Sequence, residues 1–557
     1  MHRASWKLWA AAVLSAVLLE LPFPLAGPMP PWRSIFAWFA LVPLIAAVLS
    51  AANLAARRPL LRAFLLGYVC GVLWYAGNCY WIYDTMYIYG GLPAWASAVM
   101  LAGFSLVLGL YFGIFTWGVM LVRRATGDVR WALAAAPILW TALDLAAARI
   151  TSVPWDQLGY SQVDNTLLTH LAPWTGVYGI SFLLIAGNAL ISGGLLIERC
   201  PVRRITGVCG IILAWGLTAG ILVHPPQPAP TATAVLIQPN LNVGDYNNWS
   251  GPAWDQHIAQ FARLAAKTCG PSIPGIPQLT RSVSYPECAV PAANPDLVVW
   301  PESPAPFFEQ DPRFEQAMTA IARQVHAPLI VNAIGTDYSA AQNQSNDFVS
   351  AVVFNAQGRR VGRYDKIHLV PFGEYIPFHQ LFFFAHKLAG SVPNFTHGTL
   401  RKVFLLDGHR YGVFICYEAV FADEVRQFPR LGAQVLVNIS DDGWYGDTSA
   451  PWQHLNMARM RAIENRRWLL RDTNNGVTTS IDPYGRVRQS IPRHQVGALP
   501  AKFGYSDVIT FYTAHGDVFA WICALLSIAI MIRSVQRMLS HKTSANAADE
   551  LTAKRSL

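Results

Sequence analysis

Hydrophobic positions follow two different patterns along the chain. Before about residue 223, and again near the C-terminus, apolar residues continue for about 20 positions with few charges. A run of that length can cross the roughly 30 Å hydrocarbon core of a bilayer. The pattern predicts eight membrane-spanning helices, at approximately 6–26, 34–54, 63–83, 93–121, 131–148, 168–197, 205–223 and 511–532.

Arginine and lysine residues concentrate in alternate loops between these predicted spans. Because positive charge stays on the cytoplasmic side, the pattern predicts that both termini are cytoplasmic. Eight spans then leave the segment 224–510 on the opposite, exported side by parity. The charges that set this orientation are Arg57, Arg58 and Arg62, then Arg123, Arg124 and Arg130, then Arg199, Arg203 and Arg204, and finally Arg533 and Arg537.

The composition agrees with a membrane protein. Hydrophobic residues make up 53% of the chain and charged residues only 13%, against roughly 25% charged residues in soluble proteins. The net charge of +9 is mostly explained by the arginine-rich loops. We therefore expect no nucleic-acid partner, although basic patches can serve that purpose.

The exported segment has the alternating pattern of an α/β domain. Short apolar runs typical of buried strands alternate with amphipathic runs typical of helices, which predicts a layered α/β fold. We expect three parts: a seven-helix membrane domain (1–223), an exported catalytic domain (224–510), and an eighth span with a cytoplasmic tail (511–557). Strands are predicted near 231–240, 296–302, 328–335, 348–355, 410–418, 433–440 and 475–482, and helices near 253–267, 313–326, 418–429 and 451–468.

Three of the eight cysteines lie in the exported segment. Cys269 and Cys288 flank a stretch rich in proline, glycine and serine. An oxidising compartment favours a disulfide across such a surface loop, so this pair is predicted to form a bridge. Cys416 is then left without an exported partner.

Three stretches carry residues that could act chemically: VVWPES around Glu302, YDKIHLVPFGEYIP around Lys366, and FICYEA around Cys416. Taken singly, each has a structural alternative as a loop carboxylate, a solvated charge or an inert buried thiol. Together they supply a nucleophile, a base to take its proton, and a cation to hold developing charge. Strand ends that meet at one edge of a sheet would bring them together.

These motifs resemble the nitrilase superfamily, whose sites combine a glutamate base, a lysine and a cysteine nucleophile. With PWDQLGYSQ, QPN, NISDDGWYG and the segment 450–476, the chain resembles bacterial apolipoprotein N-acyltransferases over nearly its whole length. The resemblance implies a nitrilase-like α-β-β-α sandwich inserted between the last two of eight transmembrane helices, in the bacterial inner membrane with the catalytic domain in the periplasm.

The same resemblance implies a reaction and residue roles. A fatty acyl chain would pass from a phospholipid, such as phosphatidylethanolamine, through a cysteine thioester to the amine of a diacylglyceryl-cysteine apolipoprotein. Cys416 would be the nucleophile, Glu302 the base and Lys366 the oxyanion stabiliser. The resemblance also implies that Glu374 supports the site and that its entrance is lined or gated by Trp249, Tyr417, Glu418 and Trp444.

Other polar residues leave alternatives open. His368 or His454 could pair with the cysteine or serve as structural hydrogen-bond donors, and Asp441 and Asp442 are interpreted as a loop that fixes Trp444. No cluster has zinc-ligand spacing, so neither a metal nor a cofactor is expected. Two further functions compete with acyl transfer: a membrane-anchored nitrilase-type amidase that uses water as acceptor, and a non-catalytic lipid-binding or assembly protein.

Overall fold

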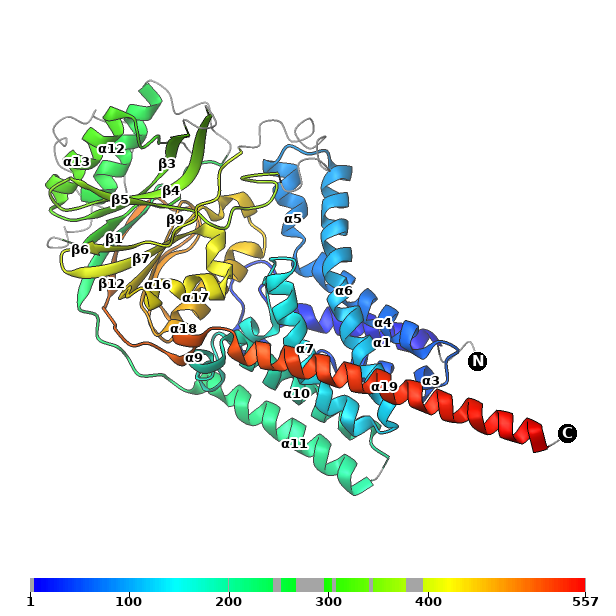
Figure 1. The fold of residues 1–557 in the computed structure, drawn as a ribbon. Coiled ribbons are helices and arrows are strands. Elements are labelled where there is room, and N and C mark those ends of the chain that lie inside the picture. Colours follow the sequence, from blue (N-terminus) through cyan, green and yellow to red (C-terminus); the bar gives the residue numbers. More distant parts are fainter. Residues whose placement is uncertain are drawn as a thin grey trace. The chain divides into compact units, whose positions relative to one another are not determined.

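The computed structural model describes residues 5–198, 200–243, 252–266, 295–302, 307–339, 344–376 and 394–555. Its residues group into two compact units, one of helices and one built on two β-sheets (Figure 1). The helical unit comprises Met1–Tyr80, Ala98–His224 and Asp517–Leu557. The second unit, here called the sandwich unit, comprises Pro225–Gly516 together with the short segment Trp81–Ser97.

Seven helical segments are long and apolar enough to cross a membrane, counted among the described residues. The first predicted span, 6–26, is the 16-residue helix α1 (Ser5–Glu20), which is shorter than the roughly 20 residues that a crossing needs. Eight spans therefore stay a prediction. The seven segments are Pro31–Leu49, Pro59–Asn78, Ala94–Thr126, Val129–Arg149, Val177–Leu196, Pro201–Leu222 and Val518–Ser540.

The helices of this unit differ from the predicted spans mainly at turns. The predicted span 168–197 is interrupted at Gly176, which has φ +64°, a conformation that glycine adopts without steric cost. Only the helix after it is long enough to span. The elements are α1, η2 (Pro31–Trp38), α2 (Val42–Leu49), α3 (Ala51–Leu54), α4 (Pro59–Asn78), α6 (Ala94–Thr126), α7 (Val129–Arg149), η4 (Leu158–Gln162), α8 (Thr166–Thr169), α9 (Ala172–Thr175), α10 (Val177–Leu196), α11 (Cys200–Thr218), η5 (Ala219–Leu222) and α19 (Val518–Arg555).

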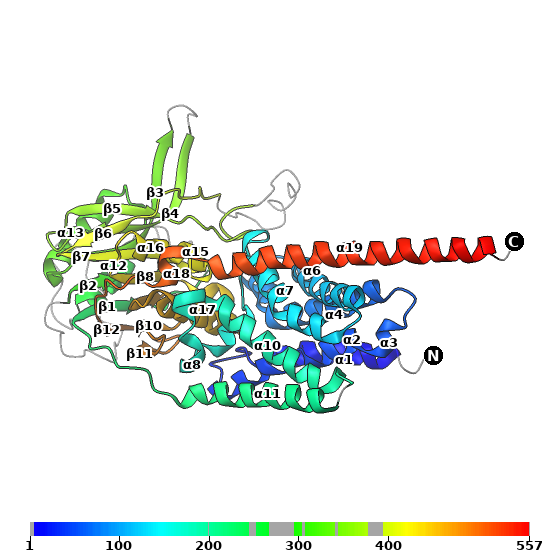
Figure 2. The same ribbon diagram turned by 60° about the horizontal axis from the view of Figure 1, so that its bottom comes forward.

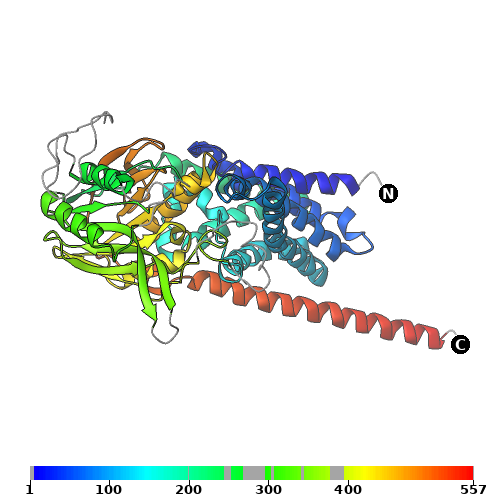
Figure 3. The same ribbon diagram turned by 90° about the horizontal axis from the view of Figure 1, so that it is seen from above.

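The last helix packs beside one that lies far earlier in the sequence. Helix α19 lies along α7 (Figures 1 and 2), and the hydroxyl of Ser527 donates to the carbonyl of Ile138 at 3.2 Å. Arg149 and the buried Asp517 form an ion pair at 2.5 Å. Figure 3 shows α19 as one straight helix that ends at the C-terminus. The chain thus returns to the helical unit after the sandwich unit.

The sandwich unit contains two six-stranded mixed sheets. The first has the strand order β12-β1-β2-β3-β4-β5 and the second β11-β10-β9-β8-β7-β6. The strands are β1 (Ala232–Gln238), β2 (Leu297–Val299), β3 (Leu329–Ser339), β4 (Gln344–Phe354), β5 (Arg360–Asp365), β6 (Val403–Leu406), β7 (His409–Ile415), β8 (Val435–Ser440), β9 (Leu469–Thr473), β10 (Thr478–Ile481), β11 (Val487–Ile491) and β12 (Gly497–Phe503).

Alternation of side chains along the strands explains how the layers stack. In β1, Ala234 and Leu236 belong to the core that the two sheets share, whereas Val235 and Ile237 pack against helices. Those helices are α12 (Pro252–Ala266) and α13 (Pro312–Val325), which cover the first sheet. Since both faces of β1 are buried, the strand is apolar at nearly every position.

The second sheet is covered by helices from the later part of the unit. Helix α17 (Ala450–Asn465) contributes Leu455, Ala458 and Ala462 to the core of this sheet. The remaining elements are α5 (Trp81–Asp84), η3 (Thr85–Tyr89), η7 (Cys416–Val420), α15 (Ala422–Val425), α16 (Gln427–Arg430), η8 (Asp442–Tyr445) and α18 (Phe511–His515). The predicted α/β layering is therefore observed.

Two of the strands that the sequence did not predict, β5 and β11, have weak patterns. Strand β5 reads RVGRYD and β11 reads VRQSI, and both carry mostly exposed or half-buried residues. Such strands lack the apolar signal that identifies a buried strand. The helix predicted over 418–429 is instead three short elements, η7, α15 and α16.

The shared core predicts a difference between two leucines on strands. Leu236 is fully buried between the sheets, whereas Leu405 on β6 is 64% exposed. We expect Leu236→Ala to lower the free energy of unfolding by about 2–5 kcal/mol, the range for a leucine truncated in a core. Leu405→Ala should stay within about 0.5 kcal/mol of the original protein. Urea unfolding in detergent, followed by tryptophan fluorescence, would measure both; equal effects would contradict this packing.

Candidate active site

Ends of three strands bring Glu302, Lys366 and Cys416 together. Lys366 directly follows β5, and Glu302 lies three residues after β2, in the same sheet. Strands β2, β3 and β5 run in the same direction, so these two residues leave the sheet at one edge. Cys416 directly follows β7 of the facing sheet. The site therefore lies at the edge of the sandwich unit where these strands of the two sheets end.

The Lys366 ammonium lies between two carboxylates. Its Nζ donates to Oε1 of Glu302 at 3.1 Å and to Oε1 of Glu374 at 2.6 Å, and its side chain is only 1% exposed. Burial alone would lower the pKa of Lys366, but the carboxylates of Glu302 and Glu374 raise this pKa well above its usual value. The lysine is therefore a fixed positive charge.

Main-chain N–H groups hold the two carboxylates in place. The N–H of Asp441 donates to Oε2 of Glu302 at 3.1 Å, and the N–H of Val370 donates to Oε2 of Glu374 at 2.8 Å. Burial raises the pKa of Glu374, while Lys366 opposes that rise. Each carboxylate thus has one oxygen on the lysine and the other on the backbone.

Cys416 occupies a strained position at the end of its strand. Its φ is +49°, in the left-handed region that costs a residue with a side chain roughly 1–3 kcal/mol. The residue is 5% exposed. Burial raises the pKa of the thiol well above its usual value, the charge of Glu302 adds to the rise, and Lys366 opposes it. A resting thiol of this kind needs a base before it can attack.

A buried histidine forms a hydrogen bond with the main chain of the strained residue Cys416. Nε2 of His454, on α17, donates to the main-chain carbonyl of Cys416 at 3.1 Å. Burial and the adjacent Arg471 lower the pKa of His454, while Asp442 and the Cys416 carbonyl oppose that decrease. Arg471 also pairs with Asp442 at 2.8 Å. Of the two roles considered for His454, this contact is that of a structural donor.

Glu418 lies inside the unit and accepts four hydrogen bonds. Its Oε1 accepts from the hydroxyl of Tyr364 at 2.8 Å and from the N–H groups of Ile367 and His368 at 2.7 and 3.2 Å. Its Oε2 accepts from the N–H of Ile415 at 2.7 Å. Glu418 is fully buried, and its predicted role at the entrance stays a prediction. It joins the loop that carries Lys366 to the strand that carries Cys416.

The remaining predicted residues lie around this centre or outside the described residues. Tyr417 is partly exposed and its ring contacts Phe421 edge-on at 5.1 Å. Trp444 is partly exposed in η8. Trp249, Cys269 and Cys288 lie outside the described residues, so the disulfide and the role of Trp249 stay predictions.

Several contacts around the site had no separate signal in the sequence. Tyr364, His454 and Arg471 are fully buried, yet nothing in their local sequence shows that they meet Glu418, Cys416 and Asp442. A polar residue inside an apolar strand, such as Arg471 in β9, is the only hint, because a buried charge requires a partner. Among the described residues, no group of three or more potential ligands could hold a metal.

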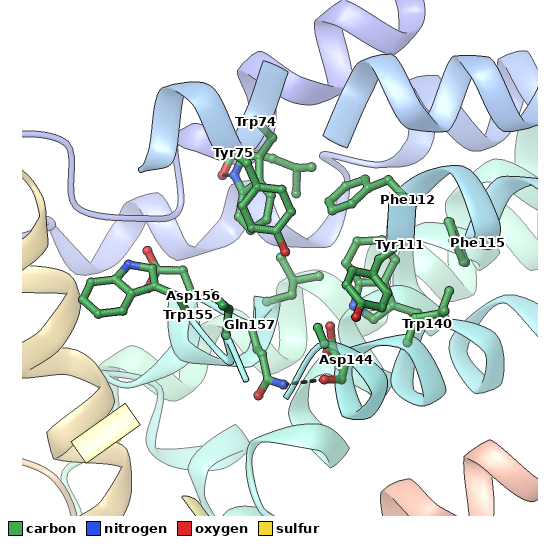
Figure 4. Close-up of a pocket in the computed structure, with 15 residues that line it drawn as sticks. Trp74, Tyr75, Tyr111, Phe112, Phe115, Trp140, Asp144, Trp155, Asp156 and Gln157 are labelled. Atoms are coloured by element: carbon green, nitrogen blue, oxygen red, sulfur yellow. Dashed lines mark hydrogen bonds between the residues drawn. The ribbon is translucent and has the colours of Figure 1, made fainter. Parts of the chain in front are cut away.

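The helical unit has a small cavity of its own (Figure 4). Its volume is about 30 Å³, and its walls include aromatic rings together with Asp144, Asp156 and Gln157. Oδ2 of Asp156 accepts from Nδ2 of Asn78 at 2.9 Å, and Nε2 of Gln157 donates to the carbonyl of Asp144 at 3.0 Å. A cavity of this size holds about one water molecule, not a lipid chain.

Comparison with known proteins identifies the family of the chain. Residues 256–501 match the carbon–nitrogen hydrolase family, and residues 7–190 match the apolipoprotein N-acyltransferase N-terminal domain. The chain is 33% identical to the apolipoprotein N-acyltransferase of Geobacter metallireducens over 540 residues, covering 95% of this chain and 96% of that protein. The enzyme of Chlorobaculum tepidum is 27% identical over 574 residues, covering 96% and 98%.

A solved amidase from Nesterenkonia sp. aligns with 52% of this chain and 94% of its own at 17% identity, with a TM-score of 0.33. The family matches place the sandwich unit in the carbon–nitrogen hydrolase, or nitrilase, superfamily. Within that superfamily the chain belongs to the apolipoprotein N-acyltransferase family, as its identity to a relative over nearly the full length of both proteins shows. It is a membrane protein with several transmembrane helices.

The electrostatics of Cys416 predict how its reactivity depends on pH. The charge of Glu302 raises the pKa of the thiol, so Glu302→Gln removes a cause of the rise and lowers that pKa. We expect the midpoint of the reaction of Cys416 with iodoacetamide to move to lower pH in this variant. Peptide mass spectrometry across a pH series would follow Cys416 separately from the other cysteines. A midpoint that moves to higher pH would contradict this prediction.

Proposed function

We propose that this chain is an apolipoprotein N-acyltransferase that moves a fatty acyl chain from a phospholipid to the N-terminal amine of a diacylglyceryl-cysteine apolipoprotein. Phosphatidylethanolamine is the proposed donor. Two half-reactions share Cys416, which carries the chain between them as a thioester. Family membership supports the overall reaction, and the arrangement around Lys366 supports the proposed residue roles.

In the first half-reaction, Glu302 accepts the proton of the Cys416 thiol and the sulfur attacks the ester carbonyl of the phospholipid. The carbonyl oxygen becomes an oxyanion next to the Lys366 ammonium and the main-chain N–H that follows the nucleophile. When this tetrahedral intermediate collapses, the bond between the carbonyl carbon and the glycerol oxygen breaks. The glycerol oxygen takes the proton from Glu302, and the lysophospholipid leaves. The thioester keeps the reactivity of the acyl group, so one difficult exchange becomes two easier ones.

In the second half-reaction, the amine of the apolipoprotein attacks the thioester carbonyl. Glu302 accepts a proton from the nitrogen, the C–S bond breaks, and the sulfur leaves to be protonated again. The Lys366 ammonium stabilises the oxyanion in both half-reactions. Removing one such donor typically costs about 2.7–4 kcal/mol of transition-state stabilisation.

One observation carries this proposal: a buried lysine bridges two carboxylates beside a strained, buried thiol. A charge that only stabilised the fold would not need a base and a thiol in the same place. The thiol is neutral at rest, because burial raises its pKa, and Glu302 is the nearby group that supplies a base. A positive charge fixed before the reaction stabilises an oxyanion without reorganisation.

The membrane helices fit a reaction between lipids. Exposing an acyl chain to water costs about 0.8 kcal/mol per CH₂, so the site should receive its substrates close to the bilayer. We propose eight spans, with cytoplasmic termini and with 224–510 as the periplasmic catalytic domain between 1–223 and 511–557. Tyr417, Trp444 and Trp249 are the proposed entrance residues. The bacterial inner membrane is the proposed location.

Labelling with an alkyne-tagged phospholipid tests the residue roles. The original protein should form an adduct that hydroxylamine removes, and Cys416→Ala should form none. Glu302→Gln should label at least about 100-fold more slowly, because a general base contributes about 10²–10⁴-fold. His368→Ala is the matched control, since this imidazole contacts Glu424 and Phe421 and should retain most of the rate. The reverse ranking would favour a cysteine–histidine mechanism.

The acceptor distinguishes acyl transfer from amide hydrolysis. Mass spectrometry of a lipoprotein N-terminus, from cells with and without this protein, should show a third acyl chain only when the protein is present. Cys416→Ala should behave like its absence. A labelled thioester that releases free fatty acid while the lipoprotein stays diacylated would instead indicate that water is the acceptor.

A further inference from the structure

The segment Trp81–Ser97 connects two membrane-spanning candidates yet groups with the sandwich unit. It begins with α5 and continues as η3, a π-helical turn in which the N–H of Gly90 donates to the carbonyl of Thr85 at 2.9 Å. Such widened turns are uncommon and occur often at functional sites. The contacts of this segment explain why it groups with the sandwich unit.

Three residues of the segment contact the turn formed by residues 441–446. The hydroxyl of Thr85 donates to the carbonyl of Trp444 at 3.0 Å. The ring of Tyr89 meets that of Trp444 edge-on at 6.3 Å, and the ring of Trp81 meets that of Tyr445 at 5.2 Å. The segment therefore contacts both the main chain and the side chains of the 441–446 turn.

The end of this turn leaves little space beside the segment. Gly446 has φ +56°, and a Cβ added there would lie 3.2 Å from the hydroxyl of Tyr89. A contact of that length is tighter than most packed side chains make. Tyr89 thus packs against the end of the turn, while Thr85 holds its middle.

The 441–446 turn in turn contacts the base and the support of the nucleophile. The N–H of Asp441 donates to Glu302 at 3.1 Å, and the Asp441 carboxylate accepts from the N–H of Gly443 at 3.0 Å. Asp442 contacts His454 at 3.0 Å, which donates to the carbonyl of Cys416. A displacement of the turn would therefore move the partners of both Glu302 and Cys416.

We infer that the segment Trp81–Tyr89 is a positioning element for the active site, in which Thr85 and Tyr89 hold the 441–446 turn against Glu302. The inference rests on the proposed function for its consequence, the rate of thioester formation. Its physical content is independent of that function: the loop between two membrane helices fixes a turn of the catalytic unit. Thr85 and Tyr89 act through Trp444 and Asp441 and do not touch the reacting atoms.

The test uses the full-length protein in detergent micelles with alkyne-tagged phosphatidylethanolamine. Thr85→Val keeps the shape of the side chain and removes the donor. We expect its single-turnover labelling of Cys416 to slow about three- to tenfold, the effect of one lost hydrogen bond, with an unchanged half-saturating donor concentration. Thr85→Ser restores the hydroxyl and should restore the rate. Tyr87→Phe is the control, because Tyr87 is 48% exposed and stacks on Tyr83 at 5.7 Å.

Hydrogen exchange measures the same inference without the reaction. Peptides that cover 441–446 should exchange faster in Thr85→Val and in Tyr89→Leu than in the original protein, and at the original rate in Tyr87→Phe. Unchanged exchange and labelling in both variants would overturn the inference. If the original protein forms no thioester, the proposed function fails, and the exchange data still decide whether the segment holds the turn.

Discussion

The active-site region depends on one buried charge, the ammonium of Lys366. Its side chain is 1% exposed, and an ion in such a place is costly unless it is paired and hydrogen-bonded. Glu302 and Glu374 supply that pairing, and main-chain N–H groups of Asp441 and Val370 hold their other oxygens. The lysine therefore fixes the relative positions of three separate loops.

In the proposed mechanism, this constraint explains how a buried thiol could react. Burial and the charge of Glu302 favour the neutral thiol, whereas Lys366 favours the thiolate. The three groups are thus coupled, and transfer of the proton from Cys416 to Glu302 leaves the total charge of the site unchanged. The transfer moves one negative charge from the carboxylate to the sulfur and therefore creates no additional buried charge.

A second layer of buried polar groups holds this arrangement. Glu418 joins the strand of Cys416 to the loop of Lys366 through four hydrogen bonds. His454 and Asp442 hold the carbonyl side of the strained cysteine. Since an unpaired polar group in such a place costs about 1–3 kcal/mol, each of these contacts favours one geometry over its alternatives.

The sequence by itself determined the apolar helices, the α/β alternation of residues 224–510 and the family, because hydrophobic period and local motifs are properties of neighbouring residues. It also identified Glu302, Lys366 and Cys416 as candidates at strand ends. Only the tertiary structure decided that Glu418 is buried, that His454 contacts a carbonyl, and that Thr85 meets Trp444 across 359 positions. Such contacts join residues with no local pattern in common, since the packing of whole sheets and helices brings them together.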